Sequence, residues 1–108
     1  MHTVIRSYTA PPAVMTEAQP KLADLEQTMR QLPGFVAYYF VKTDDGLATI
    51  TITESEIGTQ ASMGFAAEWV QQHLTETRAL MSAPAVIRGQ TLLAATASPT
   101  VTPVVTAR

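Results

Sequence analysis

The chain has 108 residues, no cysteine, and seven basic against nine acidic residues, which gives a formal charge of −2. This length fits one domain with one core. Hydrophobic residues make up 46% of the chain and charged residues 15%, a balance that excludes an intrinsically disordered protein. The absence of cysteine excludes a disulfide scaffold, a thiol nucleophile and thiolate zinc sites. Without a basic cluster, we expect neither a nucleic-acid partner nor binding to a membrane surface.

The first residues lack the pattern of a secretion signal, because Met1–Arg6 holds no cationic stretch followed by an apolar core. Polar residues interrupt every hydrophobic segment before it reaches the roughly 18–20 residues that span a bilayer. We therefore expect a cytoplasmic protein without a membrane anchor.

The first third of the chain predicts a strand and then a helix. Residues 3–8 alternate as in a strand, and one of its two faces carries Val4, Arg6 and Tyr8. A helix is predicted over residues 22–32, where apolar residues recur at helical spacing, at Leu22, Leu25, Met29 and Leu32. This helix begins either at a capping box over residues 16–19 or with Pro20 in its first turn, and Pro33-Gly34 stops it.

The middle of the chain predicts a β-hairpin. Residues 35–41 form a dense aromatic and β-branched run, and residues 47–53 alternate strictly. Asp45-Gly46 between the two runs is a strong hairpin signal, so we expect the strands to be antiparallel. The threonine face of the second strand is either exposed to solvent or packed against another sheet. Tyr38 and Tyr39 point to opposite faces, so only one of them can face a pocket.

The last third predicts a second helix and a fourth strand. Ser55 or Thr59 caps this helix, whose apolar stripe is Met63, Ala66, Ala67, Val70 and Leu74. Residues 77–84 are compatible with one more helical turn. Residues 85–93 form the last strand, in which we expect Gly89 to mark a bulge.

The order β-α-β-β-α-β is the plan of a ferredoxin-like α+β domain, with two helices on one face of a four-stranded antiparallel sheet. We assign residues 1–95 to this domain and residues 96–108 to a C-terminal tail or an extra edge strand. Such a sheet leaves its other face uncovered, and aromatic residues there would form a large exposed apolar patch. We therefore predict a homodimer in which two copies pack sheet to sheet.

Four features together resemble the antibiotic biosynthesis monooxygenase family of dimeric α+β barrels, over residues 4–93. They are the stretch Leu32–Tyr39, the Asp44-Asp45-Gly46 hairpin, the alternating strand after it and the helix entry Thr53–Glu56. The resemblance implies a homodimer whose sheets form a barrel, with a small pocket between sheet and helices. Family members include cofactor-independent oxygenases of aromatic polyketides and quinols, haem-degrading enzymes and proteins without a known activity.

The resemblance thus implies a cofactor-independent oxygenase of a small aromatic or quinol-type compound. The alternative is a non-catalytic dimer of the same fold that binds a small ligand or serves in assembly. The catalytic members carry an aromatic residue at the end of the third strand and a histidine in the second helix, where this chain has Thr53 and about Ser62. The haem-degrading members also use an asparagine of the first strand, and this chain contains no asparagine. These departures argue against haem degradation and favour the non-catalytic alternative.

Trp69 and His73 lie four residues apart, so their side chains share one face of the second predicted helix. In the functional interpretation, Trp69 stacks on a flat ligand and His73, as a catalytic residue, exchanges a proton with it. In the structural alternative, Trp69 packs in the core and His73 is half exposed at the end of the helix. Tyr38 is the third candidate for a ligand contact, through its phenol.

The histidines, His2 and His73, show no metal-binding spacing, and the paired acidic residues lie at a turn and at a helix entry. The isolated glycines match no nucleotide-binding motif. We therefore expect neither a metal nor another cofactor. Arg88 on the last strand either binds a carboxylate or phenolate or protects a sheet edge from pairing.

Overall fold

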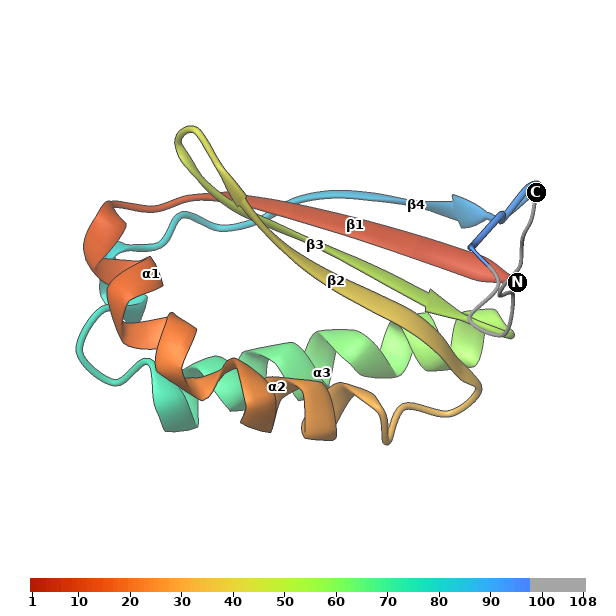
Figure 1. Cartoon of the computed structure of the whole chain (residues 1–108), viewed down its shortest axis with the longest axis horizontal. Helices are drawn as coiled ribbons and strands as arrows, with labels where there is room; N and C mark the ends of the chain where they lie inside the picture. Colours follow the sequence, from red (N-terminus) through yellow and green to blue (C-terminus); the bar gives the residue numbers. More distant parts are fainter. Residues whose placement is uncertain (98–108) are drawn as a thin grey trace, which may run out of the picture.

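A four-stranded antiparallel sheet lies over a layer of helices (Figure 1). The computed structural model describes residues 1–97. The strands are β1 His2–Thr9, β2 Phe35–Thr43, β3 Gly46–Thr53 and β4 Ala85–Gln90. The helices are α1 Pro12–Ala18, α2 Leu22–Met29 and α3 Glu56–His73, with the 3-10 helices η1 Gln19–Lys21 and η2 Arg78–Leu80. The strand order β2-β3-β1-β4 confirms the predicted ferredoxin-like α+β fold. Within residues 1–97, no helix has the length and hydropathy that a membrane crossing requires.

The first helical segment begins earlier than predicted. α1 starts at Pro12, because a fixed φ and a missing N–H suit the first turn of a helix. Residues 16–19, the predicted capping box, belong to α1 and η1, and Pro20 lies in η1 between the two helices. α1 was not predicted, whereas the alternative with Pro20 in the first turn fits η1, which leads directly into α2 at Leu22. α2 ends at Met29, three residues before the predicted end, and Gly34, with a φ of +64°, turns the chain into β2.

The threonine face of β3 packs against the helices, so both alternatives for this face were wrong. Thr49, Thr51 and Thr53 are buried on the same side as Leu47, which belongs to the main core. Thr53 Oγ1 donates a hydrogen bond to the Ser55 carbonyl at 2.6 Å, so its polar group is satisfied inside. The isoleucines of β3 consequently lie on the open face of the sheet.

A bulge in β2 decides which aromatic side chains face the helices. The pairing register of β2 and β3 shifts between Phe35 and Ala37. Phe35 therefore pairs with the buried Thr53, and it shares the helix-facing side with Tyr38. Tyr39, 47% exposed, points to the open face.

The last strand is shorter and more regular than predicted. Gly89 stays in register opposite Thr3, so the bulge expected there is absent. The strand ends at Gln90, and residues 92–93 follow it with strongly exposed side chains. Residues 98–108, most of the predicted tail or extra strand, lie outside the described residues.

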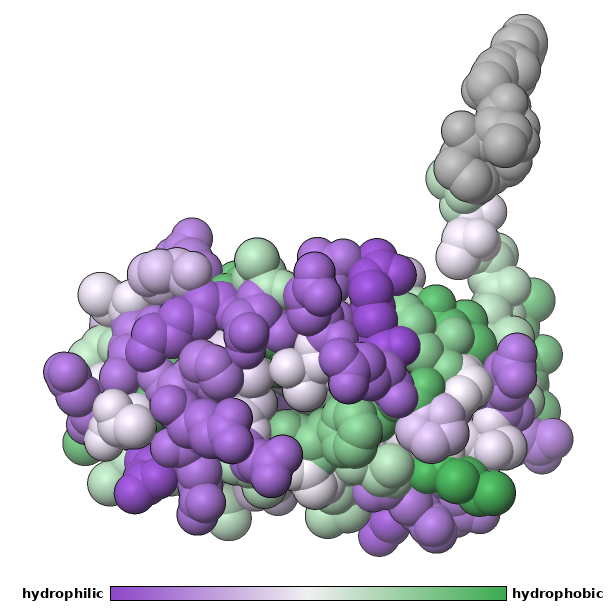
Figure 2. All heavy atoms as spheres, turned by 90° about the horizontal axis from the view of Figure 1, so that it is seen from below, coloured by the Kyte–Doolittle hydropathy of each residue, from purple (hydrophilic) through white to green (hydrophobic). Residues whose placement is uncertain are grey.

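The main core fills the space between the sheet, α1, α2 and the C-terminal part of α3. Its buried residues are Val14, Ala18, Leu25, Met29, Leu32, Leu47, Trp69 and Leu74. On the helix side of the molecule, hydrophilic residues cover much of the surface, and apolar residues reach it in the middle and toward one end (Figure 2). The N-terminal half of α3 approaches the sheet through small buried residues instead, which are Gly58, Thr59 and Ser62.

Two glycines of α3 are expected to respond oppositely to alanine. A Cβ at Gly58 would lie 2.2 Å from the Pro33 carbonyl oxygen and 2.6 Å from Thr53 Cβ, whereas one at Gly64 would meet nothing within 4 Å. Gly58→Ala should lower the free energy of unfolding by about 1–3 kcal/mol through overpacking. Gly64→Ala should raise it by about 0.5–1 kcal/mol. Urea unfolding of both variants tests this, and equal effects would show that α3 does not pack this closely on the sheet.

Candidate functional site

Four of the five residues of the apolar stripe predicted on the second helix lie along a cavity, and the fifth, Leu74, is buried in the main core. The cavity has a volume of about 310 Å³, within the range of small-molecule sites. Met63, Ala66, Ala67 and Val70 of α3 form its apolar wall. The opposite wall is Arg6 and Tyr8 of β1, and the segment around η2 completes the lining with Arg78, Met81, Ser82 and Pro84. We call this space the α3–β1 cavity.

Arg6 is the polar centre of this cavity. Only 3% of its surface is exposed, and its Nη2 donates a hydrogen bond to Ser62 Oγ at 2.8 Å. Ser62 Oγ in turn donates to the Thr59 carbonyl at 2.5 Å. The ion pairs within residues 1–97 do not include Arg6. A buried guanidinium therefore faces the cavity with neutral partners.

Two tyrosines lie beside this cation. Burial raises the pKa of Tyr8, and the positive charge of Arg6 offsets only part of the rise. Burial raises the pKa of Tyr38 well above its usual range, and Tyr8 adds to the rise. Burial lowers the pKa of Arg6, and the positive charge of Arg88 lowers it further, yet an arginine stays protonated at neutral pH. The site thus combines a charged guanidinium with two neutral phenols.

Two of the predicted ligand contacts, Tyr38 and Trp69, line a smaller space of about 30 Å³ together. This space shares Tyr8, Val70 and Met81 with the α3–β1 cavity, so the two adjoin. Trp69 is only 4% exposed and also belongs to the main core. The indole can therefore touch a ligand only at the inner end of the site.

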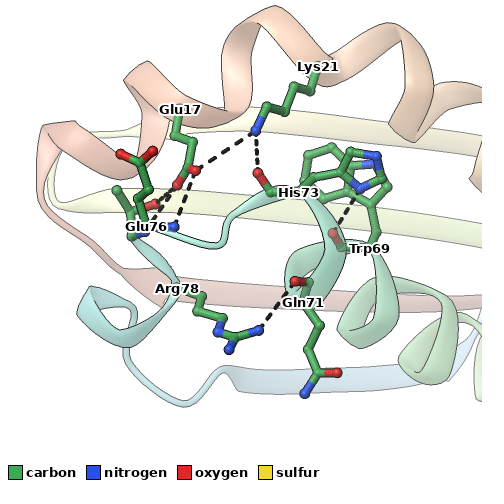
Figure 3. Close-up of polar contacts among 8 residues, drawn as sticks. Glu17, Lys21, Trp69, Gln71, His73, Glu76 and Arg78 are labelled. Atoms are coloured by element: carbon green, nitrogen blue, oxygen red, sulfur yellow. Dashed lines mark hydrogen bonds and ion pairs between the residues drawn. The ribbon is translucent and has the colours of Figure 1, made fainter.

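His73 lies behind the Trp69 indole and lines neither space. The two rings are stacked with their centroids 4.8 Å apart. Asp24 Oδ2 accepts a hydrogen bond from Trp69 Nε1 at 3.1 Å and lies 3.0 Å from His73 Nε2. His73 Nδ1 lies 3.1 Å from the Trp69 carbonyl oxygen (Figure 3), so both ring nitrogens have partners. The catalytic role predicted for His73 stays a prediction.

A polar clamp fixes the segment that follows α3 (Figure 3). Glu17 of α1 accepts hydrogen bonds from the Thr77 hydroxyl at 2.6 Å and from the N–H groups of Thr77 and Glu76. The bond from the Thr77 hydroxyl is the main reason why the pKa of Glu17 is lowered. Lys21 Nζ donates to the His73 carbonyl and lies 3.8 Å from Glu17. These contacts hold the segment that leads into the lining of the α3–β1 cavity.

Thr53 and Ser62, which the resemblance aligns with the family's catalytic positions, are fully buried. Ser62 is bonded to Arg6, and neither hydroxyl lines the α3–β1 cavity. Among residues 1–97, no group of three or more His, Asp or Glu side chains lies close enough together to hold a metal ion.

The sequence prediction missed Arg6 as a site residue. The alternation of residues 3–8 already placed Arg6 on one face with Val4 and Tyr8. A cation on the apolar face of a strand was the available signal, since lysine and arginine are rarely buried without a partner. The alternation of side chains along a strand does not by itself show which face of the sheet the helices cover.

Comparison with known proteins identifies the fold. No protein-family model and no curated protein matches this chain. A protein of unknown function from Nitrosomonas europaea is 19% identical, with a TM-score of 0.66, over 90% of this chain and 93% of its own. The heme-degrader MhuD from Mycobacterium tuberculosis, with two hemes in its active site, is 17% identical, with a TM-score of 0.64, over 89% and 100%. SnoaB, a cofactor-independent oxygenase from Streptomyces nogalater, is 19% identical, with a TM-score of 0.59, over 86% and 94%.

These likenesses confirm the predicted ferredoxin-like α+β fold. Their identities lie below 20%, so they describe the fold and not the activity of this chain.

Proposed function

We propose that this protein is a cofactor-independent oxygenase that binds a small aromatic or quinol-type compound in the α3–β1 cavity. One observation carries the proposal: the apolar stripe of α3 faces open space, and Tyr8 and Arg6 lie across from it. An apolar wall opposed by a few polar groups is the usual composition of a small-molecule site. The likeness in fold to SnoaB, a cofactor-independent oxygenase, supports the reaction type.

The proposed reaction needs no redox group from the protein. An electron-rich methylene or phenol carbon supplies all four electrons that reduce O₂. One oxygen atom becomes a carbonyl of the product, and the other leaves as water with the two hydrogens of that carbon or phenol. Anthrone and O₂ would in this way give anthraquinone and water. The protein's part is to bind the reactive aromatic compound, orient it and exclude bulk solvent.

We assign roles to the predicted site residues according to their positions. Tyr38 would direct its phenol at the ligand, and Trp69 would form the inner wall. His73 would act through Trp69 as a positioning residue, since it stacks on the indole and shares Asp24 with it. On this assignment, His73→Ala raises KM and leaves kcat largely unchanged, whereas a proton-transfer role would lower kcat.

Conversion of anthrone, followed by anthraquinone absorbance and O₂ consumption, tests the proposal. Ala67→Phe would fill the α3–β1 cavity and is expected to lower the rate at least about tenfold. Gln71→Phe adds the same ring at an exposed position of α3 and should leave the rate unchanged. A rate that equals the uncatalysed oxidation, or that is insensitive to Ala67→Phe, would overturn the proposed activity.

One observation favours a non-catalytic ligand-binding protein as the second candidate. Neither the α3–β1 cavity nor the adjoining smaller space is lined by a histidine, aspartate or glutamate, so neither contains an ordinary proton acceptor. Binding of aromatic compounds without O₂ consumption would support this candidate over the oxygenase.

We further propose a homodimer formed by the open faces of two sheets. Within residues 1–97, the helices lie on one side of the sheet, and no helix covers the other side in a single copy (Figure 1). Its apolar side chains are Ile5, Tyr39, Val41, Ile50, Ile52 and Ile87. Ile87 is 70% exposed, and single soluble domains rarely leave so large an apolar face uncovered. A second copy of the same face would bury it.

A further inference from the structure

We propose that the α3–β1 cavity takes an aromatic compound that carries a carboxylate, and that Arg6 binds this carboxylate. The inference rests on the proposed function and deepens it, because it names the substrate class. It begins from the hydrogen bonds of Arg6. A guanidinium has five N–H donors in a planar fork, and here the side chain has one hydrogen bond, from Nη2 to Ser62.

The remaining donors of Arg6 are not sealed inside the core. Within residues 1–97, one side-chain polar atom, Thr51 Oγ1, is fully buried without a hydrogen-bond partner. No nitrogen of Arg6 is both fully buried and without a partner. Arg6 lines the α3–β1 cavity although 97% of its surface is covered. Ser62 therefore holds the guanidinium at the wall of the α3–β1 cavity, where a ligand can reach its remaining donors.

The charges around this space are positive. Arg78 lines the same cavity, and Arg88 lines a small adjoining pocket together with Arg6. Glu56 borders that small pocket, but the ion pairs of residues 1–97 join it to neither arginine. A buried cation without an anion is costly, and a carboxylate ligand would supply the anion with bidentate geometry.

The two tyrosines indicate a carboxylate instead of a phenolate. Tyr8 and Tyr38 lie beside Arg6, yet their phenols stay protonated, because burial outweighs the attraction of the cation. A bound phenol would experience the same surroundings and remain neutral. A carboxylate enters already ionised at neutral pH, and the Tyr8 phenol, which lines the same cavity as Arg6, can donate a hydrogen bond to it.

Calorimetric titration at pH 7 with 2-naphthoate and 2-naphthamide tests the inference on the full chain. The two probes share ring and shape and differ in charge. We expect 2-naphthoate to bind at least about tenfold more tightly. Arg6→Met should abolish the preference for 2-naphthoate and keep the affinity for 2-naphthamide. Arg6→Lys should retain part of the preference for 2-naphthoate. Arg30→Met, which removes an exposed arginine of the α2 end, is the matched control and should change neither affinity.

Each outcome has one meaning. Equal affinities of wild-type protein for the two probes would overturn the carboxylate inference and leave the aromatic site intact. A preference that survives in Arg6→Met would overturn the assignment to Arg6. If neither probe binds, the proposed aromatic site fails as well. The comparison of the two probes on wild-type protein decides the matter even where a variant does not fold.

Discussion

Replacing Trp69 by alanine is expected to lower the free energy of unfolding by about 3–5 kcal/mol, one of the two largest effects that we predict for a single substitution. The indole is 4% exposed and joins α3 to the main core, so its removal leaves a large cavity beside Leu25 and Leu74. It also removes the stacking on His73 and the hydrogen bond to Asp24. Equilibrium urea unfolding measures the loss.

Trp69→Phe is the matched control. It keeps most of the packed ring and loses the bond to Asp24, whose side chain is 57% exposed and can bond to water instead. We expect it to cost clearly less than the alanine variant, with about 0.5–1.5 kcal/mol due to the lost hydrogen bond. An alanine variant as stable as wild type would show that Trp69 is not a core residue and would remove the structural part of its assignment.

Replacing Ile50 by lysine is expected to convert the proposed dimer into a monomer. Ile50 lies in the middle of the open face, paired with Ile5 on one side and Tyr39 on the other. A charge buried there without a partner costs several kcal/mol, which corresponds to a dissociation constant raised by a factor of about 100 or more. Native mass spectrometry over a dilution series measures the change.

Gln72→Lys places the same charge at an exposed position of α3 and should leave the dimer unchanged. The unfolding transition of Ile50→Lys, measured alongside, separates loss of assembly from loss of fold. A wild-type chain that is monomeric at micromolar concentration would overturn the proposed dimer, and a dimer that survives Ile50→Lys would place the interface elsewhere.

The order of helices and strands could be predicted from the sequence because the spacing of apolar residues in each element depends only on nearby residues. The alternation of residues 47–53 and the helical spacing of residues 63–74 each depend on neighbours along the chain, and both elements are present. The β2 bulge at Phe35 escaped prediction because it depends on how two strands pair. The start of α1 at Pro12 escaped it because a capping-box pattern also occurs inside helices.

The assignment of faces was the weakest part of the sequence prediction, since it depends on the whole fold. The alternation of β3 correctly placed its threonines on one face and its isoleucines on the other. The helices cover the threonine face. The same choice turned Arg6 inward, which made it the centre of the site. Tyr38 and Trp69, which were proposed from residue type, line one small space together, whereas the position of His73 depends on Asp24 of another helix.

The measurement that tests the central claim most directly is an NMR titration of protein labelled at its methionine methyl groups, with 2-naphthol as ligand. Met63 and Met81 line the α3–β1 cavity, Met29 is enclosed in the core, and Met15 lies beside a different surface pocket. We predict that the Met63 and Met81 signals shift on titration while those of Met29 and Met15 stay in place. Shifts confined to Met15 or Met29, or no shift at saturating 2-naphthol, would contradict a ligand site between α3 and β1.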